Sequence, residues 1–402
     1  MVKRVFKAFA YREFRLLWTG ACISSIGTWM QKLAQSWLVL ELSQSPTMLG
    51  LDVFLGQIPI FLFSVIGGVV ADRFDRRLLL VGSQIVQLTS AFLLAALFAT
   101  GAVQVWHILT LSFITGFAQA FGGPAYQALI PSLVPAADLP NAIALNSIQF
   151  NLARVIGPVL GGLALARLGA AWCFSLNGLS FFAVIVALLS LKAAAPAAAK
   201  RGVSWLASLR EGLAFIRTHT AMTPLICLAF AMTFLGVPMV DFLPVMVKEV
   251  YRRGSDAYTL LLSLSGGGAV LGALVVASLG NVQRKGLLAL MTLGVLGLFM
   301  TGFALSRSLL LGSVMLFLAG SSLIAAFAMI SSLVQLLTPD EMRGRVMSVY
   351  NVAFRGGMPL GSFVAGVLIE QSSAPVVLGA YGLALVFMSA AMLARGRRVS
   401  AL

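Results

Sequence analysis

Two stretches of the chain, about 200 residues apart, repeat serine, asparagine, arginine and proline at helical spacing. Side chains spaced in this way share one face of a helix. The two polar stripes are Ser147, Asn151, Arg154 and Pro158, and Ser348, Asn351, Arg355 and Pro359. A guanidinium group donates a planar pair of hydrogen bonds, so both arginines suit an anionic or carbonyl-rich solute. In the alternative interpretation, Arg154 hydrogen-bonds backbone carbonyls beside the Gly157–Pro158 break, and Arg355 has a similar structural role.

Three more ionisable side chains fall within apolar runs. Lys32 and Asp241 lie deepest, and Asp52 lies closer to the end of its run. An ionisable group at mid-bilayer costs roughly 2.5–3.5 kcal/mol, so each is a candidate for solute binding or proton coupling. Lys32 and Gln35 also belong to a polar stripe along the first run, which a lipid-facing helix would not tolerate. The stripe contains Ser25, Thr28, Lys32, Gln35 and Ser36.

The first and seventh runs indicate that two of these charges form a pair. With a shift of 209 residues, SSIGTWMQK aligns with TFLGVPMVD and Lys32 coincides with Asp241. Both charges then lie roughly 14 Å below the same surface. We expect a Lys32–Asp241 pair that protonation of the carboxylate would break. The alternative is that each charge is satisfied within its own half, Lys32 by Asp52 or Gln57.

The elements that must position these groups are membrane helices. Of the 402 residues, 59% are hydrophobic, a share that a water-soluble globule cannot bury. Twelve apolar runs are long enough to cross a bilayer as helices, and they lack the alternation of barrel strands. We expect these helices near residues 15–41, 47–71, 78–99, 104–127, 142–167, 171–191, 222–248, 257–279, 286–305, 309–337, 345–369 and 375–394.

The positive charge of the chain follows membrane topology. The net charge is +15, from 28 basic and 13 acidic residues. If the N-terminus is cytoplasmic, twenty of the bases fall in cytoplasmic segments, as the positive-inside rule requires. We therefore expect a multi-pass protein of the plasma (inner) membrane with both termini in the cytoplasm and no nucleic-acid partner. The first run has no cleavage site, so we expect a retained helix rather than a signal peptide.

Residues typical of enzymes and metal sites do not cluster in the sequence. Cys22, Cys173 and Cys227 are far apart, and His107 and His219 lie near expected membrane edges. The glycine-rich runs lack the lysine and serine or threonine of a phosphate-binding loop. We expect no enzyme activity, metal or cofactor, and a proton gradient rather than ATP as the energy source.

The chain also reads as two related halves. With a shift of 204 residues, Pro135 coincides with Pro339, Gly157 with Gly361, and a further glycine of GPVLGG with one of GSFVAG. An Ala/Pro tract and an amphipathic stretch separate the halves. We expect a six-helix lobe at 1–191, a cytoplasmic linker with an amphipathic helix at 192–220, and a second six-helix lobe at 221–402. Two repeated lobes are typical of a secondary transporter.

A charged cluster joins the second and third runs. In GGVVADRFDRRLLL, residues 67–80, five charges occupy the six positions from Asp72 to Arg77. The positions Gly68, Asp72, Arg73, Arg76 and Arg77 resemble the G-x-x-x-D-R-x-G-R-[KR] signature of the major facilitator superfamily, with Asp75 in place of its second glycine. With FRLLWTGACISSIGTWMQ, NAIALNS and PDEMRGRVMSVY, the chain is similar to the drug:H⁺ antiporter branch that contains macrolide-efflux proteins and enterobactin exporters.

The resemblance implies roles for two motifs. Asp72 would bind the N-terminal end of helix 11 and latch the cytoplasmic side, although the arginines around it also suit a purely topological role. GPVLGG is similar to the antiporter motif, with Ala153 in place of its preceding glycine. The motif residues are Gly157, Pro158, Gly161 and Gly162. The helix 4 motif with a buried arginine is not matched.

The resemblance further implies a monomeric, proton-coupled exporter of amphiphilic small molecules, such as drugs or siderophores. It implies that the arginine stripes of helices 5 and 11 line a central cavity. A flippase for lipids or lysolipids on the same fold is the alternative within transport, since Arg154 and Arg355 could bind a phosphate. A membrane-embedded sensor or enzyme is the remote alternative.

Overall fold

The computed structural model describes residues 6–191, 205–219, 221–279 and 284–394, and these residues form helices without a β-strand. The long helices before residue 192 are α2 (Arg12–Ser43), α3 (Pro46–Arg73), α4 (Arg76–Ala99), α5 (Val105–Leu129), α6 (Leu139–Leu168) and α7 (Ala170–Leu189). Those after residue 220 are α9 (Met222–Gly236), α12 (Ser255–Leu279), α13 (Lys285–Leu305), α14 (Leu309–Leu336), α15 (Asp340–Gln371) and α16 (Ala374–Ala394). The shorter elements are η1 (Lys7–Ala10), η2 (Ile130–Ser132), η3 (Ala136–Asp138), α8 (Trp205–Thr218), α10 (Pro238–Asp241), α11 (Leu243–Val245) and η4 (Met246–Val250).

These helices lie where the apolar runs predict them, and the all-helical membrane fold is confirmed. Among the described residues, 11 helices are long and apolar enough to cross a membrane. The 32-residue α2 is not one of them, because its polar stripe lowers its hydropathy. A helix with this pattern must turn the stripe away from lipid.

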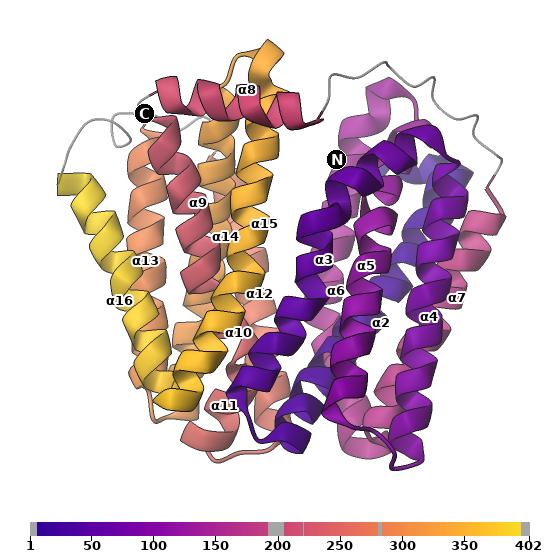
Figure 1. The fold of residues 1–402 in the computed structure, drawn as a ribbon, viewed down its shortest axis with the longest axis vertical. Helices are drawn as coiled ribbons and strands as arrows, with labels where there is room; N and C mark the ends of the chain where they lie inside the picture. Colours follow the sequence, from indigo (N-terminus) through magenta and orange to yellow (C-terminus); the bar gives the residue numbers. More distant parts are fainter. Residues whose placement is uncertain (1–5, 192–204, 220, 280–283, 395–402) are drawn as a thin grey trace. The chain divides into compact units, whose positions relative to one another are not determined.

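Packing divides the chain into two units, and the first takes in the described parts of residues 1–44 and 55–201. Within it, α2 packs against α6 and α7, and α4 packs against α5 and α7. Its core contains Phe14 and Leu17 of α2, Leu80 of α4, Leu145 of α6 and Leu188 of α7. Figure 1 draws this unit in indigo to magenta, with its long helices running alongside one another.

The second unit takes in residues 45–54, the start of α3, and the described parts of residues 202–402. Within it, α13 packs against α14 and α16, α12 against α14, and α9 against α15. A Cβ on Gly268 or Gly272 of α12 would collide with the backbone of Phe317 or Ser321 of α14, so both glycines permit close helix packing. The helix α8 lies across the end of α15 (Figure 1) and is the described part of the linker predicted at 192–220.

The seventh apolar run, predicted as one helix over 222–248, is broken in the structure. It consists of α9, α10, α11 and the π-helical η4. The breaks come at Pro238, which begins α10, and at Pro244, the second residue of α11. Proline has no N–H to donate and crowds the preceding turn, so the regular hydrogen-bond pattern ends at both positions.

Each unit has a short segment that braces its later helices. In the first unit, Lys7 lies 2.6 Å from the buried carboxylate of Asp138, and the hydroxyl of Tyr11 donates to the same carboxylate over 2.6 Å. These bonds raise the pKa of Lys7 and the pKa of Tyr11 above their usual values. In the second unit, Arg345 of α15 pairs with Glu211 of α8 at 2.8 Å.

Candidate functional site

In the first unit, two of the predicted site residues meet on one aromatic ring. The Lys32 ammonium lies 5.3 Å from the ring centroid of Trp29, and the Arg154 guanidinium carbon lies 5.8 Å from the same centroid. Both cations are within the range of a cation–π interaction. The ring of Phe150 contacts Trp29 edge-on at 6.4 Å. The helices α2 and α6 therefore bring Lys32, Arg154 and two aromatic rings into one cluster, the Trp29 cluster.

The glycines of GPVLGG explain how α6 comes so close to this ring. A Cβ on Gly157 would collide with Trp29, and one on Gly161 would lie 2.9 Å from the Cα of Met30. Pro158 and Gly162 are buried on the same helix. The motif thus allows α6 to pack directly on α2 beside the Trp29 cluster.

Other predicted polar residues of this unit make contacts between and within its helices. Gln35 of α2 donates to the hydroxyl of Ser112 on α5 over 2.9 Å. Its neighbour Gln31 accepts a bond of 2.6 Å from Asn177 on α7. Asn151 donates to the carbonyl of Ser147 within α6 over 2.8 Å. Gln31 and Gln35 therefore link α2 to two neighbouring helices.

In the second unit, Asp241 is a buried carboxylate at a helix break. It is the last residue of α10, and 5% of its surface is exposed. The hydroxyl of Ser362 on α15, which is fully buried, donates to it over 2.7 Å. A Cβ on the preceding residue, Gly361, would collide with the backbone of Phe234 in α9. Close packing of α9 and α15 therefore positions Ser362 at the carboxylate.

The start of α3 supplies Asp52 to the same unit. Asp52 is 6% exposed, so it is buried. A Cβ on Gly50 would lie 2.6 Å from the carbonyl oxygen of Ser362, which shows how closely this segment packs on α15. At the far end of α15, Glu370 accepts bonds of 2.6 Å from the Ser45 hydroxyl and 3.0 Å from the Thr47 N–H. This carboxylate caps the first turn of α3.

The stripe predicted on α15 has a different setting from its counterpart on α6. Asn351 and Arg355 are both exposed within the second unit, whereas Asn151 and Arg154 are half-buried within the first. The two arginines are 201 residues apart, three residues short of the shift that matches Gly157 with Gly361, and they do not have equivalent surroundings.

The charged cluster between α3 and α4 contains helix caps as well as surface charges. Asp75 accepts a bond of 2.8 Å from the N–H of Arg77 and so caps the start of α4. Arg76 donates to the carbonyl of Ala128 at the end of α5, and Arg77 to the carbonyl of Leu191 just beyond α7. Cations are favourable at such helix ends.

The remaining motif residues lie on the surface of this cluster. The carboxylate of Asp72 is 67% exposed and lies 3.4 Å from Arg76, and Arg73 is also exposed. A Cβ on Gly68 would meet no atom within 4 Å, whereas one on Gly67 would collide with the backbone of Ala120. Close packing of α3 on α5 therefore depends on Gly67 rather than on the motif glycine.

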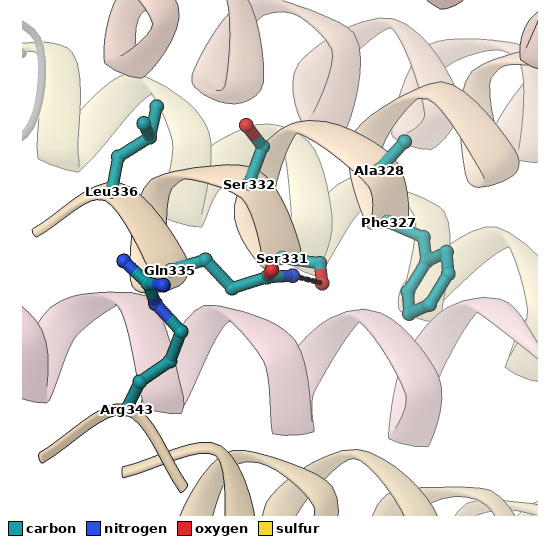
Figure 2. A pocket seen from close by; sticks show the side chains of 7 residues that line it. All are labelled: Phe327, Ala328, Ser331, Ser332, Gln335, Leu336 and Arg343. Atoms are coloured by element: carbon teal, nitrogen blue, oxygen red, sulfur yellow. Dashed lines mark hydrogen bonds between the residues drawn. The ribbon is translucent and has the colours of Figure 1, made fainter. Parts of the chain in front are cut away.

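A hollow of about 350 Å³ lies at the end of α14, and none of the predicted site residues lines it. Figure 2 shows Gln335, which donates to Ser331 over 3.3 Å, with Arg343 near one end and Phe327 at the other. Arg343 also pairs with Asp340 at 2.5 Å. The hollow is lined by Phe327, Ala328, Ser331, Ser332, Gln335, Leu336 and Arg343. The described residues contain no group of three His, Cys, Asp or Glu side chains placed to hold a metal.

Trp29, Phe150 and Ser362 of these clusters were missed by the sequence interpretation. Trp29 lies three positions before Lys32, so helical spacing already places it on the same face. Ser362 directly follows Gly361, and a hydroxyl at that place has no recognisable pattern.

Comparison with known proteins covers almost the whole chain. The family model described as transmembrane secretion effector matches residues 4–400. The chain is 21% identical over 364 residues to macrolide efflux protein A of Streptococcus pyogenes, covering 89% of this chain and 90% of that protein. It is 27% identical over 385 residues to an enterobactin exporter of Escherichia coli, and the match covers 94% of this chain and 91% of that protein. It is 23% identical over 350 residues to a staphyloferrin A transporter of Staphylococcus aureus, and the match covers 86% of each protein.

Solved structures have the same fold. A crystal structure of the nucleoside transporter NupG superposes with a TM-score of 0.73 at 16% identity, covering 95% of this chain and 98% of that one. A D-xylose–proton symporter gives a TM-score of 0.70 at 15% identity, covering 93% and 96%.

Proposed function

Because the chain belongs to the transmembrane secretion effector family of the major facilitator superfamily, we propose that it exports amphiphilic small molecules by proton-coupled alternating access. The observation that carries the proposal is the match along residues 4–400, together with relatives named for efflux of macrolides and export of siderophores. The solute is drug-like or siderophore-like, with apolar and polar parts.

The comparisons confirm several expectations at once. The chain is a multi-pass membrane transporter rather than an enzyme, and the resemblance to the major facilitator superfamily holds along its length. Its relatives are transporters of small molecules, so we expect its partner to be a small-molecule substrate.

Proton coupling is the part of the proposal that rests on individual residues. Asp241 is a buried carboxylate held by Ser362 at a break between short helices, and it is therefore the first candidate for the coupling acid. Protonation would remove its charge and weaken any bond that depends on it. Asp52 is the second candidate for the coupling acid. The pairing of Lys32 with Asp241 remains a prediction.

The remaining elements of the proposal concern topology and movement. We place both termini in the cytoplasm of a bacterial cell and the protein in the inner membrane, as a monomer without a cofactor. The lobes 1–191 and 221–402 would rock around the solute, and Asp72 would latch the cytoplasmic side. The exposed carboxylate of Asp72 is accessible for such a contact.

Flux measurements on the purified full-length protein in proteoliposomes test the proposal. An imposed pH gradient should drive accumulation of an exported macrolide or siderophore, and collapse of the gradient with a protonophore should abolish it. Flux that ignores the gradient would contradict proton coupling. Movement of a labelled lysolipid without flux of either solute would instead support the flippase.

A further inference from the structure

The hollow at the end of α14 places polar side chains on an otherwise apolar membrane helix. Ser331, Ser332 and Gln335 line it, although the sequence of α14 contains no Asp, Glu, Lys or Arg. At the opposite end of the helix, Leu310 and Leu311 are the exposed side chains. A lipid-facing surface would not tolerate three neighbouring polar side chains, so the lining indicates contact with water or a solute.

The polar groups of the hollow have unused hydrogen-bonding capacity. The amide nitrogen of Gln335 donates to the hydroxyl of Ser331 over 3.3 Å, as Figure 2 shows. Within the described part of the chain, the hydroxyl of Ser332 and the amide oxygen of Gln335 make no hydrogen bond. A hydroxyl both donates and accepts, and an amide oxygen accepts. The hollow therefore offers donors and acceptors to a ligand.

The charge on the lining is already paired. Of the described residues that line the hollow, Arg343 carries the charge, and it pairs with Asp340 at 2.5 Å. Its neighbours on α15 have both signs, since Glu341 precedes it and Arg345, paired with Glu211, follows it. An anionic ligand would compete with Asp340, and a cationic ligand would find no carboxylate among the described lining residues. The lining therefore favours an uncharged polar group.

An aromatic layer borders the hollow at its other end. Phe327 lies at that end in Figure 2 and packs on Phe354 of α15, with 4.6 Å between ring centroids. Phe354 stacks in turn on Tyr350. Tyr350 is 1% exposed, and its hydroxyl, near Ser331, has no hydrogen-bond partner within the described residues. Buried polar groups are normally hydrogen-bonded, so this hydroxyl would gain a bond if a ligand turned Ser331 toward it.

The size and place of the hollow suit a solute that enters from the cytoplasm. Its volume of about 350 Å³ falls in the range of small-molecule sites, roughly 300–1,000 Å³. Arg343 lies two residues from Arg345, which pairs with α8, so the hollow is at the end of the second unit that α8 crosses (Figure 1). In the proposed topology this end is cytoplasmic.

We propose that this hollow binds the uncharged, hydroxyl- or carbonyl-bearing part of an amphiphilic solute before export. The apolar part of the solute lies against Phe327 and Ala328, while Ser332 and Gln335 exchange hydrogen bonds with the polar part. The inference rests on the proposed function as an exporter, and it names the chemical class that this site accepts, neutral amphiphiles rich in hydroxyl or carbonyl groups.

Three probes that share one aromatic ring test the inference. 2-Naphthyl β-glucoside is neutral and rich in hydroxyls, 2-naphthyl sulfate is anionic and 2-naphthylmethylammonium is cationic. Each would be titrated at equilibrium against the full-length protein in nanodiscs of neutral phosphatidylcholine, with empty nanodiscs as the blank for partitioning. We expect the affinity for the glucoside to exceed that for either charged probe at least fivefold, because it gains several hydrogen bonds. A smaller or reversed preference of the wild-type protein would overturn the inference.

Variants then assign the preference to the hollow. Ala328→Leu places extra bulk in it and should lower the affinity for the glucoside at least fivefold. Ser332→Ala should lower that affinity about threefold, and Ser332→Thr, which keeps the hydroxyl, should retain it. The control is Ser263→Ala on α12, whose hydroxyl donates within its own helix over 2.7 Å, and it should bind like the wild type. If well-folded Ala328→Leu and Ser332→Ala proteins keep the wild-type affinity, the hollow is not the site.

The binding assay separates this inference from the proposed function. Nanodiscs carry no pH gradient, so binding of the glucoside does not require proton coupling. A protein that binds the glucoside in the hollow but shows no gradient-driven flux would contradict the proposed function alone. A protein with gradient-driven flux but no preference for the glucoside would contradict this inference alone.

Discussion

The two units place opposite charges among their helices. The first holds Lys32 and Arg154 on Trp29, whereas the second buries Asp241 beside Ser362. The repeat of 204 residues relates helices but not these side chains, since it places Met358 rather than Arg355 at the position of Arg154. The difference shows that one helical framework has acquired a basic, aromatic cluster in one half and an acidic one in the other.

The short segments that brace the two units, η1 in the first and α8 in the second, also carry opposite charges at matching positions. Lys7 lies 204 residues before Glu211, and Asn141 lies 204 residues before Arg345. In the first unit Asn141 accepts a bond from the N–H of Ala8, and in the second Arg345 pairs with Glu211. The contact between the segment and the helix is thus kept while its chemistry has changed.

The largest expected effect is that of Asp241→Asn. This variant keeps the size of the side chain but cannot lose a proton, so we expect gradient-driven flux to fall to background. The measurement is solute accumulation in proteoliposomes after a pH jump. Ser362→Ala, which removes the hydrogen bond but keeps the acid, should retain part of the flux.

Full flux in a well-folded Asp241→Asn protein would contradict its role and leave Asp52 as the candidate acid. Exchanging the two charges tests the predicted Lys32–Asp241 pair. Lys32→Asp and Asp241→Lys should each abolish flux, and the double variant should restore part of it.

A smaller effect is expected for Asp72→Asn in the first unit. Removal of the negative charge weakens an electrostatic latch but keeps the arginines that set topology, so flux should decrease several-fold while membrane insertion is unchanged. Labelling of single cysteines from the cytoplasmic side should increase at the same time. Wild-type flux together with unchanged labelling would argue that Asp72 is only a surface charge.

Equivalent glycines in the two units allow a direct comparison of packing. Gly361→Ala would push a methyl group into the backbone of Phe234, and Gly157→Ala would push one into Trp29. Overpacking costs about 1–3 kcal/mol, and we expect the larger loss at Gly361, where three backbone atoms of Phe234 lie within 2.7 Å of the added Cβ. Thermal unfolding in detergent measures both. Gly344→Ala is the matched control on α15, because a Cβ there meets no atom within 4 Å.

The smallest effects concern the braces. Glu211→Gln removes a partly exposed ion pair, and we expect the free energy of unfolding to decrease by less than about 1 kcal/mol. Asp138→Asn should lower the unfolding temperature more, because the buried carboxylate has two partners. The pKa of Lys7 is raised and the pKa of Asp138 is lowered by their pairing, so the stability from the pair is fully present between about pH 3.8 and pH 10.5. It is lost only as the pH rises through the folded-state pKa of Lys7 or falls through that of Asp138. The difference between these variants should therefore persist from pH 6 to pH 9.

The apolar runs were sufficient to predict the helices, because length and hydropathy decide membrane spans. They could not predict the breaks in the seventh run, although Pro238 and Pro244 are visible there, since prolines such as Pro59 and Pro158 remain inside helices. The cost of placing an ionisable side chain within a membrane span identified Lys32 and Asp241 as candidates for solute binding or proton coupling. It could not find Ser362, whose role depends on which residue faces it across the packed helices.

The breaks around Asp241 have a mechanical consequence. A continuous helix resists bending because backbone hydrogen bonds join each turn to the next. Pro238 and Pro244 have no backbone N–H and cannot donate such bonds. The second unit therefore contains two soft joints within one run, set among long helices that are stiff. The carboxylate of Asp241 sits on the four-residue segment between these joints. A small rotation of that segment would redirect the carboxylate while α9 and α15 keep their shapes.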